Sequence, residues 1–172
     1  MAAPEEEFKS DRFLHEIKRR DAVREVVDVE EEQVKIVVFT CGTERYAFYG
    51  RDIREILPPR EIAWMPELPS YLPGLINVRG DIESVIDIRC FLGQEKTDLS
   101  QCLVAMAVRD DFRSGILVDT IDDVIDIPSS VVRPPLSTLA GAARDLVTGE
   151  IELAGNPVSL VGIERLATHL TI

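Results

Sequence analysis

The sequence is 172 residues long, with 45% hydrophobic and 29% charged residues and a formal net charge of −12. This length allows one domain of ordinary size or two small subdomains that share a core, and the composition is typical of a globular protein. The acidic balance argues against nucleic acid and anionic membrane surfaces as partners, because binding to either relies on an excess of Lys and Arg.

The first 33 residues differ in composition from the rest of the chain. They contain eleven acidic and six basic residues and no glycine, and their short apolar stripe breaks after Ile17. We expect residues 1–33 to form a charged leader, either an amphipathic helix that docks on the body or on a partner, or a solvated and partly ordered segment. The acidic start is unlike a signal peptide, and no apolar run approaches the ~20 residues of a membrane span. We therefore expect a cytoplasmic protein with no direct membrane insertion.

From Val34 onward the pattern indicates short β-strands. Two strands flank Gly42-Thr43, a hairpin signal, and residues 81–89 alternate between apolar and polar side chains. Further extended runs cover residues 61–66, 102–109, 114–119, 121–128, 145–153 and 157–163. Helices are expected to be few and short, at residues 51–57, 89–92 and 164–170. Short strands joined by Gly, Pro and Asp turns predict a mainly β domain over residues 34–172, built as barrels or a sandwich.

The polar stretch "GQEKTDLSQ" at residues 93–101 separates the strands into two groups along the chain. We expect these two groups to form two subdomains that pack against each other, with a groove between them as a natural binding place.

Histidine and cysteine do not form a recognisable reactive or metal-binding pattern. His15 and His169 lie near opposite ends of the chain, and neither has a partner at metal-ligand spacing. Cys41, Cys90 and Cys102 are widely spaced and odd in number, which indicates reduced thiols rather than a disulfide framework. We expect all three to be small buried residues.

The aspartates of "VDTIDDVIDIP" also fail to match a known site. Asp119, Asp122, Asp123 and Asp126 have neither calcium-loop nor aspartic-protease spacing, and strand alternation accounts for most of them. Glycine-rich phosphate loops are missing as well. We expect no catalytic residue, no metal and no cofactor, and a small hydrolase using these carboxylates is a remote alternative.

Several apolar residues suit either a core or an interaction surface. Ile53, Ile56 and Leu57 are spaced for one face of a helical turn beside Glu55. Val85 and Val124 stand among acidic residues that we expect to point outward. Such residues either pack in or around the core, or gather into an apolar patch with a polar rim.

Arg79 lies in the turn of "GLINVRGDIESVIDIR". Two interpretations are open for this residue. It forms an internal salt bridge, for example with Asp81 or Asp87, or it serves as an interface arginine, a residue type enriched at binding hot spots.

Four segments resemble the CheW family in order and spacing, over about residues 35–168. They are "FTCGTERYAFYGRDIREIL", "LPSYLPGLINVRGDIESVIDIRCFLG", "SGILVDTIDDVIDIPSSVVRPP" and "VTGEIELAGNPVSLVGIERL". The core pattern N-x-R-G-x-x-x-x-x-I-D-x-R is specific. CheW proteins couple chemoreceptors to the histidine kinase CheA in bacterial chemotaxis.

The resemblance implies two packed, five-stranded SH3-like β-barrels, no catalysis, and action at receptor arrays on the inner face of the membrane. It implies two partners, the regulatory domain of CheA and the helical hairpin tip of a methyl-accepting chemoreceptor, together with self-association in arrays. From the resemblance and the apolar spacing together, the expected partner-binding residues are Ile53, Glu55, Ile56, Leu57, Gly74, Asn77, Arg79, Gly80, Val85, Gly115, Ile121 and Val124.

The sequence departs from the family pattern in a few places. Ser84-Val85-Ile86 replaces the usual proline-containing segment, Gly162 stands where an aspartate is common, and the leader is long. An adaptor of a non-flagellar pathway, such as pilus motility or development, is therefore an alternative to flagellar chemotaxis.

Overall fold

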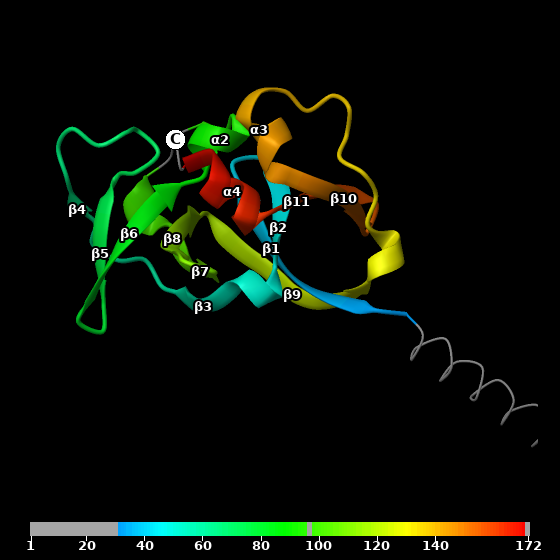
Figure 1. Ribbon diagram of the computed structural model, residues 1–172, viewed down its shortest axis with the longest axis horizontal. Coiled ribbons are helices and arrows are strands. Elements are labelled where there is room, and N and C mark those ends of the chain that lie inside the picture. The colour runs from blue at the N-terminus through cyan, green and yellow to red at the C-terminus, as the bar shows by residue number, and fades with distance from the viewer. Residues whose placement is uncertain (1–30, 96–97, 171–172) are drawn as a thin grey trace, which may run out of the picture. The chain divides into compact units, whose positions relative to one another are not determined.

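The computed structural model describes residues 31–95 and 98–170, in which β-strands dominate and form two sheets (Figure 1). The described residues from Val34 onward form one compact unit. The mainly β prediction is confirmed, whereas the predicted leader lies almost entirely outside the described residues. None of the described helices has the length and apolar character that crossing a bilayer requires.

The five-stranded sheet combines strands from both ends of the described chain. Its spatial order is β10-β11-β2-β1-β9. The expected hairpin forms at its centre, where Cys41 pairs with Glu44 and leaves Gly42-Thr43 as the loop. The strands are β1 (Gln33–Cys41), β2 (Glu44–Tyr49), β9 (Thr120–Pro128), β10 (Val147–Leu153) and β11 (Asn156–Val161).

The six-stranded sheet contains the middle of the chain, in the order β3-β7-β8-β6-β5-β4. Its β5–β6 hairpin is followed in space by a parallel pairing of β6 with β8. The strands are β3 (Ile53–Leu57), β4 (Ala63–Trp64), β5 (Gly74–Val78), β6 (Asp81–Asp87), β7 (Leu103–Arg109) and β8 (Phe112–Val118).

The strands do not divide between the sheets at residues 93–101, because each sheet takes strands from both sides of this stretch, and the two sheets have five and six strands. The five-stranded sheet takes two strands from before this stretch and three from after it. The reason is a set of long-range pairings across this stretch: β2 with β11 and β6 with β8, which are parallel, β3 with β7, which is antiparallel, and β1 with β9. Chain order does not reveal such pairings, because strands that are distant in sequence become neighbours only in the folded sheet.

Two of the three helices predicted from the sequence are present in the structure. Those at residues 89–92 and 164–170 are confirmed, whereas residues 51–57 are not helical: η1 is followed directly by β3. β3 pairs antiparallel with β7. The hydrogen bonds and side-chain contacts with β7 stabilise the extended conformation more than the helical spacing of three apolar residues favours a helix. The helical elements are α2 (Arg89–Leu92), α3 (Gly141–Leu146) and α4 (Ile163–Leu170), with 3-10 turns η1 (Gly50–Asp52), η2 (Leu99–Gln101) and η3 (Ser129–Val131).

One apolar cluster joins the two sheets and the last helix. Phe39 and Phe48 of the five-stranded sheet stack with ring centroids 4.2 Å apart. They belong to the same buried cluster as Ile86 and Ile116 of the six-stranded sheet and Leu166 of α4. Burial of these side chains holds the sheets together through the hydrophobic effect.

A buried ion pair lies at the end of β6. The Arg89 Nε donates to Asp87 Oδ1 at 3.0 Å, and neither side chain is more than 3% exposed. The Arg89 Nη1 lies 3.8 Å from Asp119 Oδ1. The expectation that Asp87 and Glu83 point outward is wrong, because both side chains are buried and each forms an ion pair, Asp87 with Arg89 and Glu83 with Arg113.

Candidate functional site

The tip of the β5–β6 hairpin presents Arg79. Val78 pairs with Asp81, so Arg79 and Gly80 form a two-residue loop with φ of +53° and +89°. The Asn77 side-chain oxygen accepts a hydrogen bond from the Gly80 amide at 2.8 Å and closes the turn. Two-residue hairpin loops of this kind need positive φ at both central positions, which glycine adopts freely.

Arg79 forms a two-pronged ion pair with Glu55 of β3. Its Nη1 and Nη2 donate to the two carboxylate oxygens at 2.9 and 2.6 Å. The hydrogen bonds from Arg79 hold the pKa of Glu55 below its usual value, helped by the charges of Arg79, Arg113 and Arg60. The salt-bridge interpretation is thus confirmed, but the partner is Glu55 rather than Asp81 or Asp87.

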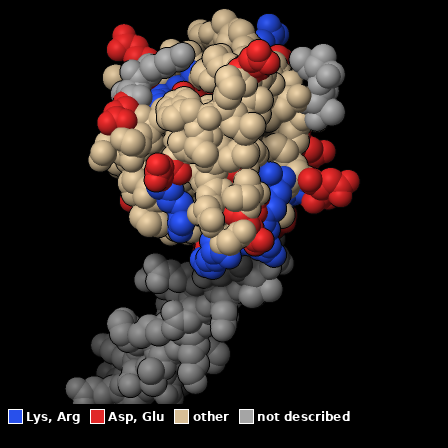
Figure 2. Space-filling view, turned by 90° about the vertical axis from the view of Figure 1, so that its left-hand side faces the viewer, with Lys and Arg blue, Asp and Glu red and all other residues tan. Residues whose placement is uncertain are grey.

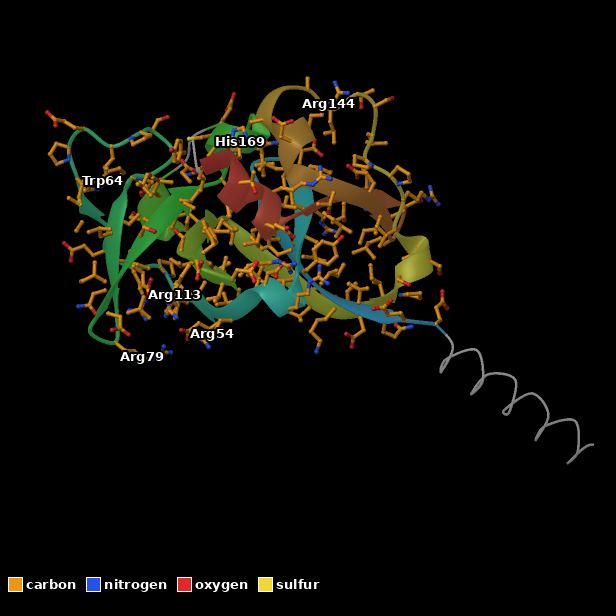
Figure 3. The ribbon with its side chains drawn as sticks, viewed as in Figure 1. Arg54, Trp64, Arg79, Arg113, Arg144 and His169 are labelled. Carbon is orange, nitrogen blue, oxygen red and sulfur yellow. The ribbon has the colours of Figure 1, made fainter. Side chains whose placement is uncertain are left out.

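The pair remains accessible, because the Arg79 side chain is 69% exposed and that of Glu55 is 25% exposed. Two neighbouring arginines reinforce this end of the sheet. The Arg113 Nε donates to Glu83 at 2.6 Å, and the Arg60 Nη1 donates to the Asn77 carbonyl at 3.0 Å. Figure 3 shows Arg54, Arg79 and Arg113 at the same end of the six-stranded sheet.

The other expected partner-binding residues fall into two groups. Ile53, Ile56 and Ile121 are half-buried and pack against the central cluster, and Val124 of β9 is 52% exposed. Leu57 and Val85 are buried in a second apolar cluster, so the core-packing alternative holds for these two residues, and their part in partner binding stays a prediction. Val85 lies on the face of β6 that packs in this second cluster.

Gly74 and Gly115 are buried on either side of Val85. Gly74 pairs with Val85 on β5–β6, and Val85 pairs with Gly115 on β6–β8. A Cβ atom at Gly115 would lie 2.6 Å from Val104 Cγ1, and one at Gly74 would meet the Ala63 carbonyl oxygen. These glycines therefore allow close packing in the interior, and their part in partner binding stays a prediction.

The sequence reasoning missed the exposed apolar residues at the β4 edge of the six-stranded sheet. We call this set the β4–β6 edge: Trp64, Met65 and Leu68 lie in and after β4, and Ile82 lies on β6, with Trp64 67% and Ile82 63% exposed. The strand register places the Trp64 and Ile82 side chains on opposite faces of the sheet. Figure 2 faces this end of the molecule and shows a broad uncharged surface with basic and acidic residues at its margins. The run "EIAWMP" was a usable signal, because a short apolar strand between prolines has little room to be buried.

The acidic stretch around β9 does not form a dyad. Asp119 accepts a hydrogen bond from the Gly42 amide, whereas Asp122 accepts hydrogen bonds from Thr40 and Thr120. The Asp123 Oδ1 accepts a hydrogen bond from the Val124 amide. Within residues 31–95 and 98–170, no three His, Cys, Asp or Glu side chains are grouped so as to hold a metal ion.

The three thiols differ in their surroundings. Cys41 and Cys102 are buried as expected, and burial raises their pKa values to about 12 and about 11. Cys90 is exposed on α2, so the expectation of burial is wrong for this residue. The turn of α2 directs it away from the core that receives its neighbours Arg89 and Phe91.

The family model of the CheW-like domain matches residues 35–171 of this chain. The chain belongs to the CheW-like domain family. The resemblance seen in the sequence is thereby confirmed, and the N-x-R-G motif of the family is the hairpin that carries Arg79.

Relatives support the same assignment. The chemotaxis protein CheW of Klebsiella aerogenes is 27% identical over 133 residues, which are 77% of this chain and 80% of the relative. The protein FrzA of Myxococcus xanthus is 24% identical over 132 residues, covering 74% of this chain and 81% of the relative. The crystal structure of the scaffolding protein TtCheW from Thermoanaerobacter tengcongensis superposes on this chain with a TM-score of 0.69. The superposition covers 76% of this chain and 89% of that one, and the two sequences are 27% identical.

Proposed function

We propose that this chain is a non-catalytic adaptor that couples chemoreceptor signalling tips to a histidine kinase of the CheA type. The observation that carries the proposal is the family match over residues 35–171, which includes the exposed Arg79–Glu55 pair on the family's N-x-R-G hairpin. In this role the protein works at receptor arrays on the inner face of the membrane and needs no cofactor.

The receptor tip is a helical hairpin, and helices bind proteins by laying an apolar face into a groove. Ile53, Ile56 and Ile121 are half-buried beside the central cluster, and Val124 is exposed, so these residues offer aliphatic contacts from β3 and β9. The Arg79–Glu55 pair adds a fixed guanidinium and carboxylate that set the register of the bound helix.

The kinase regulatory domain is the partner we assign to the β4–β6 edge. Trp64 of the edge strand β4 and Ile82 of β6 supply large exposed apolar groups on opposite faces of this end of the sheet, and the charged margin seen in Figure 2 fits the rim of an interface. Self-association in arrays would use the same edge. Many modest contacts of this kind together stabilise an array.

A sedimentation experiment with the full chain tests the proposal. A chemoreceptor hairpin-tip fragment and a CheA regulatory domain, each from the same genome, are mixed separately with wild type, Arg79→Glu, Ile82→Asp and Arg144→Glu. We expect Arg79→Glu to weaken receptor binding at least about tenfold, because it sets two carboxylates side by side, and Ile82→Asp to weaken kinase binding.

Arg144→Glu is the control, because it makes the same charge change at a distant surface (Figure 3). It should bind both partners like wild type. Failure of wild type to bind either partner would refute the adaptor, and equal effects of Arg79→Glu and Arg144→Glu would remove Arg79 from the interface.

The similarity to FrzA supports a second candidate, an adaptor of a non-flagellar pathway. Deleting the gene separates the two roles. Loss of swimming bias with normal surface motility favours flagellar chemotaxis, whereas the reverse favours the alternative.

A further inference from the structure

A cleft lies apart from both the Arg79–Glu55 pair and the β4–β6 edge. It encloses about 1040 Å³ and is lined by residues of β2 and η1, the end of β7, α3, β10 and α4. Figure 3 shows two of its lining residues, Arg144 and His169, on the opposite side of the view from Arg79. A concave space of this size suits a small organic ligand better than a protein surface, since small-molecule sites are concave and of this order of volume.

The lining of the cleft is basic, although the chain as a whole is acidic. Four arginines line it against three carboxylates, which gives a formal charge of +1 with His169 neutral, in a chain of formal charge −12. The arginines are Arg51, Arg109, Arg144 and Arg165, and the carboxylates are Asp52, Asp145 and Glu164. Such a local reversal of sign attracts anions.

One arginine neutralises two of the three carboxylates. The Arg109 Nη1 donates to Asp52 at 3.0 Å, and its Nη2 donates to Glu164 at 3.3 Å. Asp52 is buried, so this bond also compensates its removal from water. Arg109 is therefore part of the wall of the cleft rather than a free ligand-binding group.

The other three guanidinium groups have no carboxylate within ion-pair distance among residues 31–95 and 98–170. The Arg51 guanidinium carbon lies over the Tyr49 ring, 5.0 Å from its centroid, which fixes the plane and leaves the N–H edges open. The Arg165 Nη1 lies 3.5 Å from the carbonyl oxygens of Asp145 and Val147, at the outer limit of a hydrogen bond. Arg144 is exposed on α3.

The first turn of α4 also faces this cleft. The Gly162 carbonyl accepts the Leu166 amide at 3.0 Å, so the helix begins after a residue that has no side chain to cap it. Gly162, Ile163, Glu164 and Arg165 all line the cleft. The Gly162 amide donates to the Leu146 carbonyl at 3.0 Å. The amides that follow it in the first helical turn have no partner within the helix, so they are the backbone donors at this end of the cleft.

We infer that this cleft binds a small organic phosphate. A phosphate offers three acceptor oxygens and up to two charges, so it can accept hydrogen bonds from several guanidinium groups at once, whereas a single carboxylate offers two oxygens and one charge. Arg51, Arg144 and Arg165 are the binding residues, and Arg109 holds the wall. This inference does not depend on the adaptor function.

Isothermal titration calorimetry of the full chain with pyrophosphate tests the inference. Wild type should bind saturably, and Arg51→Ala and Arg144→Ala should each weaken binding about tenfold, as expected for loss of one charge-assisted contact. Arg54→Ala is the matched control, because it removes an exposed arginine at the Arg79 end of the molecule. It should bind pyrophosphate like wild type.

A gain of affinity is expected from Asp145→Asn, which removes a negative charge from the lining without deleting a donor. This variant keeps the inference testable if an arginine variant fails to fold. Absence of saturable binding by wild type, or equal weakening by Arg54→Ala and Arg144→Ala, would overturn the site. Citrate binding as tightly as pyrophosphate would overturn the choice of phosphate.

Discussion

Arg79 holds a backbone conformation that arginine rarely adopts, with φ of +53°. A side chain in the left-handed region costs roughly 1 kcal/mol or more relative to an ordinary conformation, because Cβ approaches the following carbonyl oxygen. Asparagine tolerates this region better and is common in two-residue hairpin loops. The presence of arginine here is therefore better explained by its guanidinium than by the needs of the turn.

We predict that Arg79→Asn separates function from folding. The relief of backbone strain should offset the loss of the exposed ion pair with Glu55, so the urea midpoint should stay within experimental error of wild type or rise. Receptor binding should fall, as we expect for Arg79→Glu. A clearly lowered midpoint would mean that the Arg79–Glu55 pair stabilises the fold and would weaken the functional argument.

The thiols provide a second test at the residue scale. Only the thiolate reacts readily, and burial raises the pKa of Cys41 to about 12 and of Cys102 to about 11, so both remain protonated at pH 8. We predict that a thiol reagent labels one cysteine, Cys90, rapidly in the native protein and three in urea. In Cys90→Ser the fast phase should vanish, and a surviving fast phase would show that a buried thiol is accessible.

At the scale of elements, β3 shows why local spacing misled. Ile53, Ile56 and Leu57 fit a helical face, but the segment lies beside β7 and takes its conformation from that partner. The β1–β2 hairpin and α4 were predictable, because Gly42 at the loop and the apolar spacing of the last helix are local signals. The form of β3, which depends on its distant neighbour β7, was not.

Gly115 provides the test of packing between elements. A methyl group there would lie 2.6 Å from Val104 Cγ1 and 3.2 Å from Val85 Cγ1. We predict that Gly115→Ala lowers the free energy of unfolding by about 1–3 kcal/mol, the usual range for overpacking a core. Urea denaturation followed by circular dichroism measures the change.

The companion variant is Val104→Ala, which creates space at the same contact. If the crowding is real, the double variant should be destabilised by less than the sum of the two single variants, because each change relieves part of the other. Strict additivity would indicate that residue 115 tolerates a side chain and that its glycine has another purpose.

At the scale of the whole molecule, the two sheets interleave the chain. The five-stranded sheet needs β1 and β2 from before residues 93–101 and β9, β10 and β11 from after it. The central cluster draws on both sheets and on α4. Neither half of the sequence can therefore bury its apolar surface alone.

We predict that fragments 34–95 and 98–172, produced separately, do not unfold cooperatively by circular dichroism. Mixing the two fragments should restore part of the β signal, because the missing strands are then supplied. A cooperative transition in either fragment alone would support the sequence-based division into two subdomains and contradict the interleaved arrangement.

The sequence by itself determined the family, the mainly β class and most strand positions, and it predicted a role for Arg79, because hydrophobic alternation, turn residues and the N-x-R-G motif are local features of the sequence. Only the tertiary structure decided that Arg79 pairs with Glu55, that Val85, Leu57, Gly74 and Gly115 are interior, and that Trp64 and Ile82 are exposed. It also brought together, from separate elements, the arginines that line the cleft beside α4. These features depend on which strands become neighbours, and that is fixed by burial across the whole molecule rather than by any short segment.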